Sequence, residues 1–262
     1  MITVLTPTYN RAYTLTRVFQ SLSEQIDSRF EWLVIDDGST DETRELVEKW
    51  SQQARFKIRY IHQVNGGKHV AINTGCKLAY GEWILILDSD DILTPDAVST
   101  VNEIIENNVQ PEILGFCFRK AYLDGILIGE IKNIGFKLFL HPTEAGTLLK
   151  GDLAYIFRRS SLQSHPFPVF CREKFVPELY IWNKIGDDGK ILFFTHKVIY
   201  LCEYLSDGYS ENFSKNLKRN PKGFLIFYRS QFFREKSVVR KLKCAIRSVQ
   251  CLCYAFVNKL QT

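Results

Sequence analysis

Hydrophobic and polar positions alternate in blocks along the first hundred residues of the chain. Short apolar runs, typical of buried strands, are separated by segments whose apolar residues recur every three or four positions, as on one face of a helix. The predicted strands are ITVL, EWLVI, KIRYIH and WILIL, at residues 2–5, 31–35, 57–62 and 83–87. This alternation of strand and helix predicts an α/β fold with a doubly wound, mostly parallel sheet.

The starts of three helices can be predicted from their first residues. The segment 12–25 carries apolar residues at helical spacing. Ser39 and Glu42 stand three apart, as in a capping box, which predicts the start of the second helix. Thr94 and Pro95 are expected at the N-cap and the first position of the helix after the fourth strand.

The segments directly after the four strands are polar and rich in small residues. They read TPTYNR, DDGS, QVNGGK and DSDD. Ligands of doubly wound sheets bind beyond the carboxyl ends of the strands. We therefore expect the functional site at this edge of the sheet.

The second half of the chain has a less regular pattern. Further elements are predicted as strands at 113–118, 153–158 and 190–194 and as a helix around 176–186. We predict one domain over residues 1–210, with halves 1–110 and 111–210. From about residue 211 the pattern is helical and basic, which predicts a C-terminal extension over 211–262.

Charge is distributed unevenly along the chain. The whole chain carries a formal charge of +5, yet from residue 215 on twelve lysines and arginines stand against one glutamate, a net charge of +11. Between these cations, apolar residues such as Leu242, Ile246 and Val249 recur at helical spacing. A basic amphipathic helix suits an anionic membrane surface, so we expect one as a partner of residues 215–259. The alternative is a solvated helix packed on the domain; no nucleic-acid recognition motif accompanies the charge.

Cysteine usage and hydropathy bear on the compartment. The seven cysteines include no pair at zinc-finger spacing, and the first residues lack the pattern of a secretory signal, which favours reduced thiols. No apolar run approaches the roughly 18–20 residues of a membrane span. We expect a cytoplasmic protein, peripheral on the inner face of the cell membrane if the basic extension binds lipid.

Three aspartates, Asp88, Asp90 and Asp91, follow the fourth strand. Carboxylates at this spacing repel one another unless a cation or a reaction requires them. Carboxylate ligands combined with substrate phosphates are typical of Mg²⁺ or Mn²⁺ holding a diphosphate. The alternative role, stabilising the start of the next helix, is already supplied by Asp96.

Polar residues after the other strands suit a nucleotide. Of the neighbours Asp36 and Asp37, one can accept hydrogen bonds from a nucleobase and the other can bind a ribose hydroxyl, while Tyr9 can stack on the base. The alternatives are a simple turn and ordinary packing of the ring. The glycine pair 66–67 allows close backbone approach to phosphate, and Lys68 adds a positive charge there.

Taken in order and spacing, TPTYNR, VIDDGSTDET, NGGKHVAINTG and WILILDSDD resemble the pattern of glycosyltransferase family 2 on the GT-A fold. The resemblance is strong over residues 2–100 and extends weakly to about 210. It implies an inverting transferase that uses a nucleotide-diphospho-sugar and a divalent metal. Residues 1–110 would then be the nucleotide-sugar-binding half and 111–210 the acceptor half.

The resemblance also implies roles for individual residues. Asp90 is expected as the principal metal ligand, with Asp88 at the metal or the ribose, and Asp91 at the acceptor. An inverting transferase needs a general base for the acceptor hydroxyl, and Glu178, at a predicted helix start, is assigned to it. Its alternative role is to stabilise that helix. The expected donor-binding residues are Thr8, Tyr9, Asp36, Asp37, Lys68, Asn73, Asp88 and Ser89.

The predicted function is transfer of a hexose or N-acetylhexosamine, from a UDP-linked donor, to a hydroxyl of a glycan or lipid-linked acceptor in surface polysaccharide synthesis. One departure from the family pattern is Ile72, where many relatives carry arginine; Lys68 is the candidate to replace that charge. A sugar-phosphate nucleotidyltransferase would want a glycine-rich basic loop after the first strand, which TPTYNR is not. A non-catalytic sugar-nucleotide or glycan-binding protein on the same fold is the other alternative.

Overall fold

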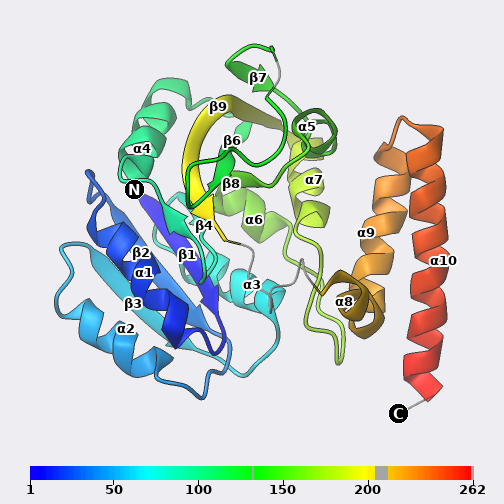
Figure 1. Ribbon diagram of the computed structural model, residues 1–262, viewed down its shortest axis with the longest axis horizontal. Coiled ribbons are helices and arrows are strands. Elements are labelled where there is room, and N and C mark those ends of the chain that lie inside the picture. The colour runs from blue at the N-terminus through cyan, green and yellow to red at the C-terminus, as the bar shows by residue number, and fades with distance from the viewer. Residues whose placement is uncertain (132, 204–211, 261–262) are drawn as a thin grey trace.

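The computed structural model describes residues 1–131, 133–203 and 212–260, and one mixed sheet runs through its centre (Figure 1). The strands are β1 (Ile2–Thr8), β2 (Phe30–Asp36), β3 (Lys57–His62), β4 (Trp83–Ile86), β5 (Ile92–Leu93), β6 (Ile113–Tyr122), β7 (Lys137–Phe139), β8 (Leu153–Arg158) and β9 (Lys190–Cys202). Their order in the sheet is β3-β2-β1-β4-β8-β6-β9-β5, and β7 also pairs with β9.

Helices connect these strands and form the C-terminal part of the chain. They are α1 (Ala12–Ser23), α2 (Thr43–Ser51), α3 (Lys68–Leu78), α4 (Ala97–Asn108), α5 (Pro142–Leu149), α6 (Arg159–Ser164), α7 (Leu179–Asp188), α8 (Phe213–Arg219), α9 (Pro221–Arg234) and α10 (Val238–Leu260). Helix α5 and strand β7 lie in the stretch whose sequence pattern is irregular.

The N-terminal half of the sheet is parallel. Strand β1 pairs in parallel with β2 and β4, and β2 pairs in parallel with β3. In this register Thr8 lies opposite Asp36, and Asp36 lies opposite His62. The carboxyl ends of these strands therefore meet at one edge, and the predicted α/β fold with a doubly wound, mostly parallel sheet is confirmed.

Both faces of this parallel sheet are covered. Neighbouring residues of a strand point to opposite faces, so Val4 and Trp32 join a core with α1, α2 and α4, whereas Leu5 and Leu33 join a second core with α3 and α7. Burial on both faces explains why the sequence of these strands is continuously apolar rather than alternating.

The second half of the sheet joins the first through β8, which runs antiparallel to β4 and to β6. Strand β9 runs parallel to β6 and is longer than predicted. This pairing places Lys120 of β6 beside Tyr200 of β9. Both residues are therefore carried toward the edge at which β4 ends.

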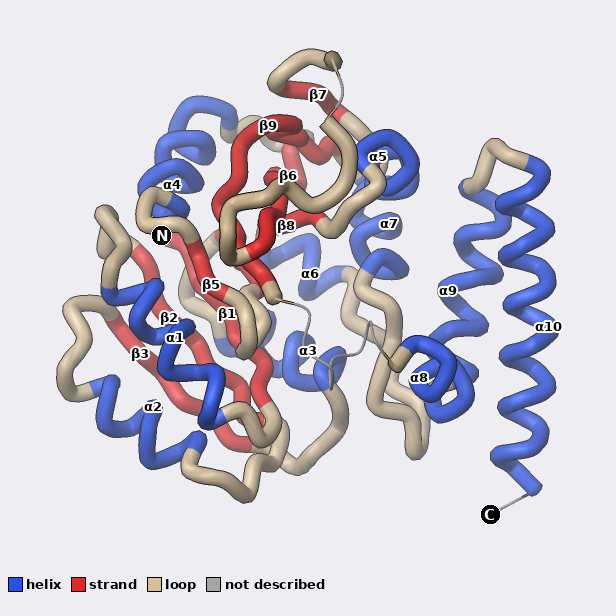
Figure 2. The backbone as a smooth tube through the Cα atoms, viewed as in Figure 1, coloured by secondary structure: helices blue, strands red, loops and turns tan. Residues whose placement is uncertain are grey.

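The C-terminal helices form a separate layer at one end of the molecule. Figure 2 shows α9 and α10 side by side, with α9 nearer the sheet. Phe224 of α9, Leu217 of α8 and Cys251 of α10 are buried together in a small core. Among the described residues, none of the helices combines the length and the apolar character needed to cross a membrane.

The predicted capping box at the start of the second helix is wrong. Helix α2 begins at Thr43, one residue after Glu42. Ser39 Oγ instead accepts a hydrogen bond from the Asn10 backbone N–H at 2.8 Å, which ties the loop after β2 to the loop after β1. The Thr43 N–H donates a hydrogen bond of 3.2 Å to Asp41 Oδ1, so Asp41 supplies the carboxylate at this helix start.

The predicted start of the helix after β4 is also wrong, by two residues. Helix α4 begins at Ala97 with Asp96 at its N-cap position. Thr94 lies two residues before the N-cap: its hydroxyl donates to Asp96 Oδ1 at 2.8 Å, and its N–H donates to the Ile199 carbonyl of β9 at 3.0 Å. Pro95 then occupies the turn before the helix rather than its first position.

Candidate active site

A cleft of about 740 Å³ opens at the edge where the parallel strands end. It is lined by residues from both halves of the chain. Of the site residues predicted from sequence, those that line it are Thr8, Tyr9, Asp37, Lys68, Asp88, Ser89, Asp90, Asp91 and Glu178. Asp36 and Asn73 do not line the cleft.

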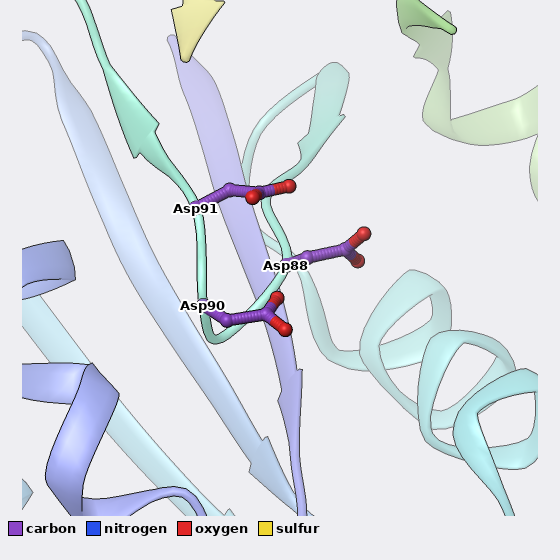
Figure 3. A group of neighbouring side chains, drawn as sticks. All are labelled: Asp88, Asp90 and Asp91. Carbon is purple, nitrogen blue, oxygen red and sulfur yellow. The ribbon is translucent and has the colours of Figure 1, made fainter. Parts of the chain in front are cut away.

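The three aspartates after β4 lie together on one wall of the cleft. Figure 3 shows Asp88, Asp90 and Asp91 projecting to the same side of the loop between β4 and β5. Each offers a carboxylate oxygen, and these oxygens lie within 4.8 Å of one another. In the part of the chain that the structure describes, no other three His, Cys, Asp or Glu side chains offer ligand atoms this close.

The three carboxylates differ in their electrostatic surroundings. Burial, followed by the charge of Asp88, raises the pKa of Asp91 to about 7. The same two causes, in the same order, raise the pKa of Asp90. Burial also acts to raise the pKa of Asp88, but the charges of Lys68 and Lys120 outweigh burial and lower that pKa. The cluster therefore holds mutual repulsion that a bound cation would relieve.

Two residues from the second half of the chain, Tyr200 and Lys120, contact this cluster. The Tyr200 hydroxyl accepts a hydrogen bond from the Asp88 N–H at 2.9 Å and donates one to the Asp91 carboxylate. The Lys120 ammonium lies 4.0 Å from Asp91 Oδ2 and 3.8 Å from the centre of the Tyr200 ring. The Tyr200 hydroxyl thus holds the loop after β4 at two points, the backbone of Asp88 and the side chain of Asp91.

Lys68 joins the cluster to Glu178, which comes from the second half of the chain. Its ammonium lies 2.6 Å from Asp88 Oδ1 and 2.7 Å from Glu178 Oε1. Burial acts to lower the pKa of Lys68, but the charges of Asp88 and Glu178 outweigh it and raise it. Lys68 therefore remains a cation, held between the predicted metal site and the predicted base.

Glu178 stands at the N-cap position of α7, directly after Pro177. Its backbone carbonyl accepts hydrogen bonds from the N–H groups of Ile181 and Trp182 in the first turn of the helix. Its side chain makes no capping hydrogen bond and points instead to Lys68. This geometry leaves the carboxylate available to the cleft.

The glycine pair after β3 serves Asp37 and a neighbouring loop. Asp37 accepts hydrogen bonds from the N–H groups of Gly66 and Gly67 at 2.8 and 2.7 Å, and from the Gln63 side chain at 2.7 Å. Gly67 has a φ of +97°, and a Cβ built there would lie 2.2 Å from the Lys174 carbonyl oxygen. The missing side chain at Gly67 thus lets the backbone of Lys174 approach closely.

The remaining predicted donor residues have different surroundings. Asp36 is buried and accepts hydrogen bonds from the Ser39 N–H at 2.8 Å and from the Tyr60 hydroxyl. Asn73 holds residue 167 through two hydrogen bonds of 2.8 Å to its backbone. Tyr9 is half exposed and lines the cleft, a geometry compatible with stacking.

Sequence reasoning missed Lys120, Tyr200 and Arg17. Arg17 of α1 donates to the Asp90 carbonyl and forms an ion pair of 2.7 Å with Glu203. These contacts span 73 and 186 positions along the chain. No local motif surrounds the three residues, so only the pairing of β6 with β9 and the position of α1 bring them to the site.

Comparison with known proteins identifies the class. The family model described as glycosyl transferase family 2 matches residues 3–119. An uncharacterized glycosyltransferase of Nostoc sp. is 33% identical over 196 residues, which cover 74% of this chain and 59% of that protein. The poly(ribitol-phosphate) beta-N-acetylglucosaminyltransferase TarS of Staphylococcus aureus is 33% identical over 107 residues, which cover 40% of this chain and 19% of TarS.

Solved structures confirm the fold. The structure of TarS residues 1–349 with UDP-GlcNAc aligns with a TM-score of 0.63 at 21% identity, over 98% of this chain and 72% of that one. The mannosyltransferase PcManGT of Pyrobaculum calidifontis, solved with GDP-Man and Mn²⁺, aligns with a TM-score of 0.62 at 17% identity, over 100% of this chain and 75% of that one.

The chain thus has the GT-A fold and belongs to glycosyltransferase family 2. It spans 59% of the length of the Nostoc relative and smaller shares of other curated relatives, for example 46% of one from Mycoplasma pneumoniae.

Proposed function

We propose that the chain is an inverting, metal-dependent glycosyltransferase that uses a nucleotide-diphospho-sugar. The observation that carries this proposal is the position of Lys68 between Asp88 and Glu178. It brings the residue expected at the donor diphosphate and the expected general base to one ammonium in one cleft, which supports the proposal. An inverting displacement needs both a site that holds the departing diphosphate and a base that takes the proton of the attacking hydroxyl.

The donor set on the cleft wall fits a divalent metal. Asp88, Asp90 and Asp91 offer hard oxygen ligands within 4.8 Å of one another, as Mg²⁺ or Mn²⁺ prefers. We propose Asp90 and Asp88 as the ligands, and Asp91 as a contact of the acceptor. A bound cation would neutralise negative charge on the diphosphate as it leaves.

In the proposed reaction, Glu178 accepts the proton of an acceptor hydroxyl. That hydroxyl oxygen forms a bond to the anomeric carbon, while the bond from this carbon to the diphosphate oxygen breaks and its electron pair leaves with the diphosphate. Lys68 helps to hold the carboxylates of Asp88 and Glu178 in place. The other proposed donor contacts are Thr8, Tyr9, Asp37 and Ser89, which line the cleft; Asp36 and Asn73, predicted from sequence, lie outside it and are not among them.

We further propose that the donor is a UDP-linked hexose or N-acetylhexosamine and the acceptor a glycan or lipid-linked hydroxyl in surface polysaccharide synthesis. The similarity to TarS, whose name gives N-acetylglucosaminyl transfer to poly(ribitol-phosphate), supports this class. The proposed location is the cytoplasm, at the inner face of the membrane.

Replacing Glu178 by glutamine tests the assignment of the base. The amide keeps the size of the side chain but cannot take a proton, so we expect turnover to fall by at least about 100-fold. Donor binding, measured by calorimetry, should stay within a few fold of wild type. Unchanged turnover would contradict the assignment.

Glu144→Gln is the matched control. Glu144 lies in the first turn of α5, outside the cleft, and pairs with Lys236. This variant loses a helix-terminal carboxylate but no predicted catalytic group. It should turn over like wild type. Equal losses in both variants would favour the alternative that Glu178 only stabilises its helix.

A further inference from the structure

The C-terminal layer exposes an apolar face that the proposed reaction does not use. In α10, Cys244 and Cys251 are buried against the rest of the layer, with Cys251 0% exposed. The opposite face of the helix is exposed, and Ile246 on it is 59% exposed. We define this outer α10 face by its exposed apolar residues Val238, Val239, Leu242, Ile246, Val249, Leu252, Phe256 and Val257.

The outer α10 face is continuous along the helix. Val239, Leu242, Ile246 and Val249 follow one another at spacings of three and four residues, which keeps them on one side of an α-helix. The helix has 23 residues and is therefore about 35 Å long. Exposed apolar stripes of this size mark contact surfaces.

The charges beside this face suit a negatively charged partner. On the helical wheel, Lys241 and Lys259 lie along one side of the apolar stripe, and Lys243 lies along the other. No aspartate or glutamate occurs between residues 238 and 260. An apolar stripe flanked by lysines suits a membrane with anionic lipids: the apolar side chains enter the boundary of the acyl chains and the ammonium groups remain at the headgroups.

A second copy of the chain suits this face less well. Pairing of two α10 helices along the stripe would place their lysine rows next to each other without any acidic partner on either helix. Anionic headgroups supply the missing negative charge, at about 1 kcal/mol per basic residue near the surface. We propose that the outer α10 face docks the protein on an anionic lipid bilayer.

The docking layer is joined to the cleft through one loop. The Glu173 carboxylate accepts hydrogen bonds from the N–H groups of Lys222 and Gly223, at the start of α9, at 3.0 and 2.9 Å. The next residues of this loop, Lys174 and Phe175, line the cleft. If the proposed function holds, docking would keep the cleft of a bound protein near lipid-linked or membrane-borne acceptors.

Flotation with lipid vesicles tests the proposal on the full chain. Vesicles of phosphatidylcholine containing phosphatidylglycerol are compared with vesicles of phosphatidylcholine alone. Wild type should float with the anionic vesicles and lose this binding at high salt. The double variant Ile246→Asn, Val249→Asn should bind at least about tenfold more weakly.

The matched control is Ile126→Asn, Val169→Asn, which changes the same residue types at equally exposed positions elsewhere. It should bind vesicles like wild type. A second pair separates charge from apolar contact: Lys241→Gln, Lys243→Gln should lower binding to anionic vesicles by about fivefold per charge. The control pair is Lys49→Gln, Lys77→Gln, at exposed sites on α2 and α3, which should leave binding to anionic vesicles unchanged.

Several results would overturn the proposal. One is that wild type does not float with anionic vesicles. Another is that the Ile246/Val249 variant floats as well as its control. A third is that the protein binds no vesicles but forms a dimer in solution that the Ile246/Val249 variant disrupts. Binding of the donor nucleotide is measured alongside. Its retention in a variant that no longer floats shows an intact fold, and its absence in wild type would count against the proposed function while leaving the docking result to stand alone.

Discussion

Strands β2 and β4 both end in neighbouring aspartates, but the two groups have different surroundings. At the end of β2, Asp36 and Asp37 accept hydrogen bonds from backbone and side-chain donors of the protein. At the end of β4, Asp88, Asp90 and Asp91 face one another across less than 5 Å, with raised pKa values for the last two.

The comparison shows that a cluster of carboxylates is not by itself a site. The donors supplied by later parts of the chain decide whether the charge is satisfied internally. The glycine loop after β3 gives Asp37 two backbone N–H groups. In the described part of the chain, Asp90 has a hydrogen bond from its own backbone N–H but no pair of loop N–H groups like that at Asp37, so its charge is less well satisfied within the protein.

The largest expected effect is on catalysis at the end of β4. Asp90→Asn removes a proposed metal ligand while keeping the shape of the side chain. We expect turnover to fall by about 1,000-fold, because charge on the leaving diphosphate is no longer neutralised. The free energy of unfolding in metal-free buffer should not fall, since the substitution also removes repulsion from Asp88. Steady-state kinetics and urea unfolding measure both; wild-type turnover would remove Asp90 from the metal site.

The next effect is on stability at the end of β2. Asp37→Ala leaves the N–H groups of Gly66 and Gly67 and the Gln63 amide without their acceptor. Because Asp37 is buried, we expect the free energy of unfolding to fall by about 3 kcal/mol. Asp41→Ala is the control: Asp41 also accepts hydrogen bonds but is exposed, so water replaces them at a cost of about 1 kcal/mol. Equal losses of unfolding free energy in the two variants, measured by urea unfolding, would contradict the contrast between buried Asp37 and exposed Asp41.

The smallest effect concerns the link between Asp88 and Glu178. Lys68→Met removes the ammonium between Asp88 and Glu178 and should lower kcat/KM by about tenfold through weaker donor binding. Lys174→Met, at another lysine that lines the cleft and bonds to Asn65, is its control. A wild-type kcat/KM in the Lys68 variant would show that the bridge is dispensable.

Local sequence pattern was sufficient for the parallel half of the molecule. The strands and their polar ends follow from apolar periodicity, and the topology of parallel strands brings those ends to one edge. It was insufficient for helix starts, because the hydroxyls of Ser39 and Thr94 bond to Asn10 and Asp96 instead of capping helices.

The parts of the site that sequence could not predict come from long-range packing. Tyr200 and Lys120 reach the aspartates only because β9 pairs with β6. The bridge of Lys68 to Glu178 joins residues 110 positions apart. In the C-terminal extension, helical periodicity predicted an amphipathic helix, but only burial of Cys244 and Cys251 shows which face is covered.

The most direct test of the account is nucleotide binding that depends on both metal and Asp90. Calorimetric titration of UDP, GDP, CMP and dTDP is carried out on wild type and Asp90→Asn, each with and without Mn²⁺. We expect that one nucleoside diphosphate, UDP, binds wild type in the presence of Mn²⁺, and that omission of the metal or loss of Asp90 weakens binding by at least about 1.4 kcal/mol, a factor of ten. Equal affinity with and without Mn²⁺, or in Asp90→Asn, would contradict the claim that the carboxylates after β4 hold a metal-bound diphosphate.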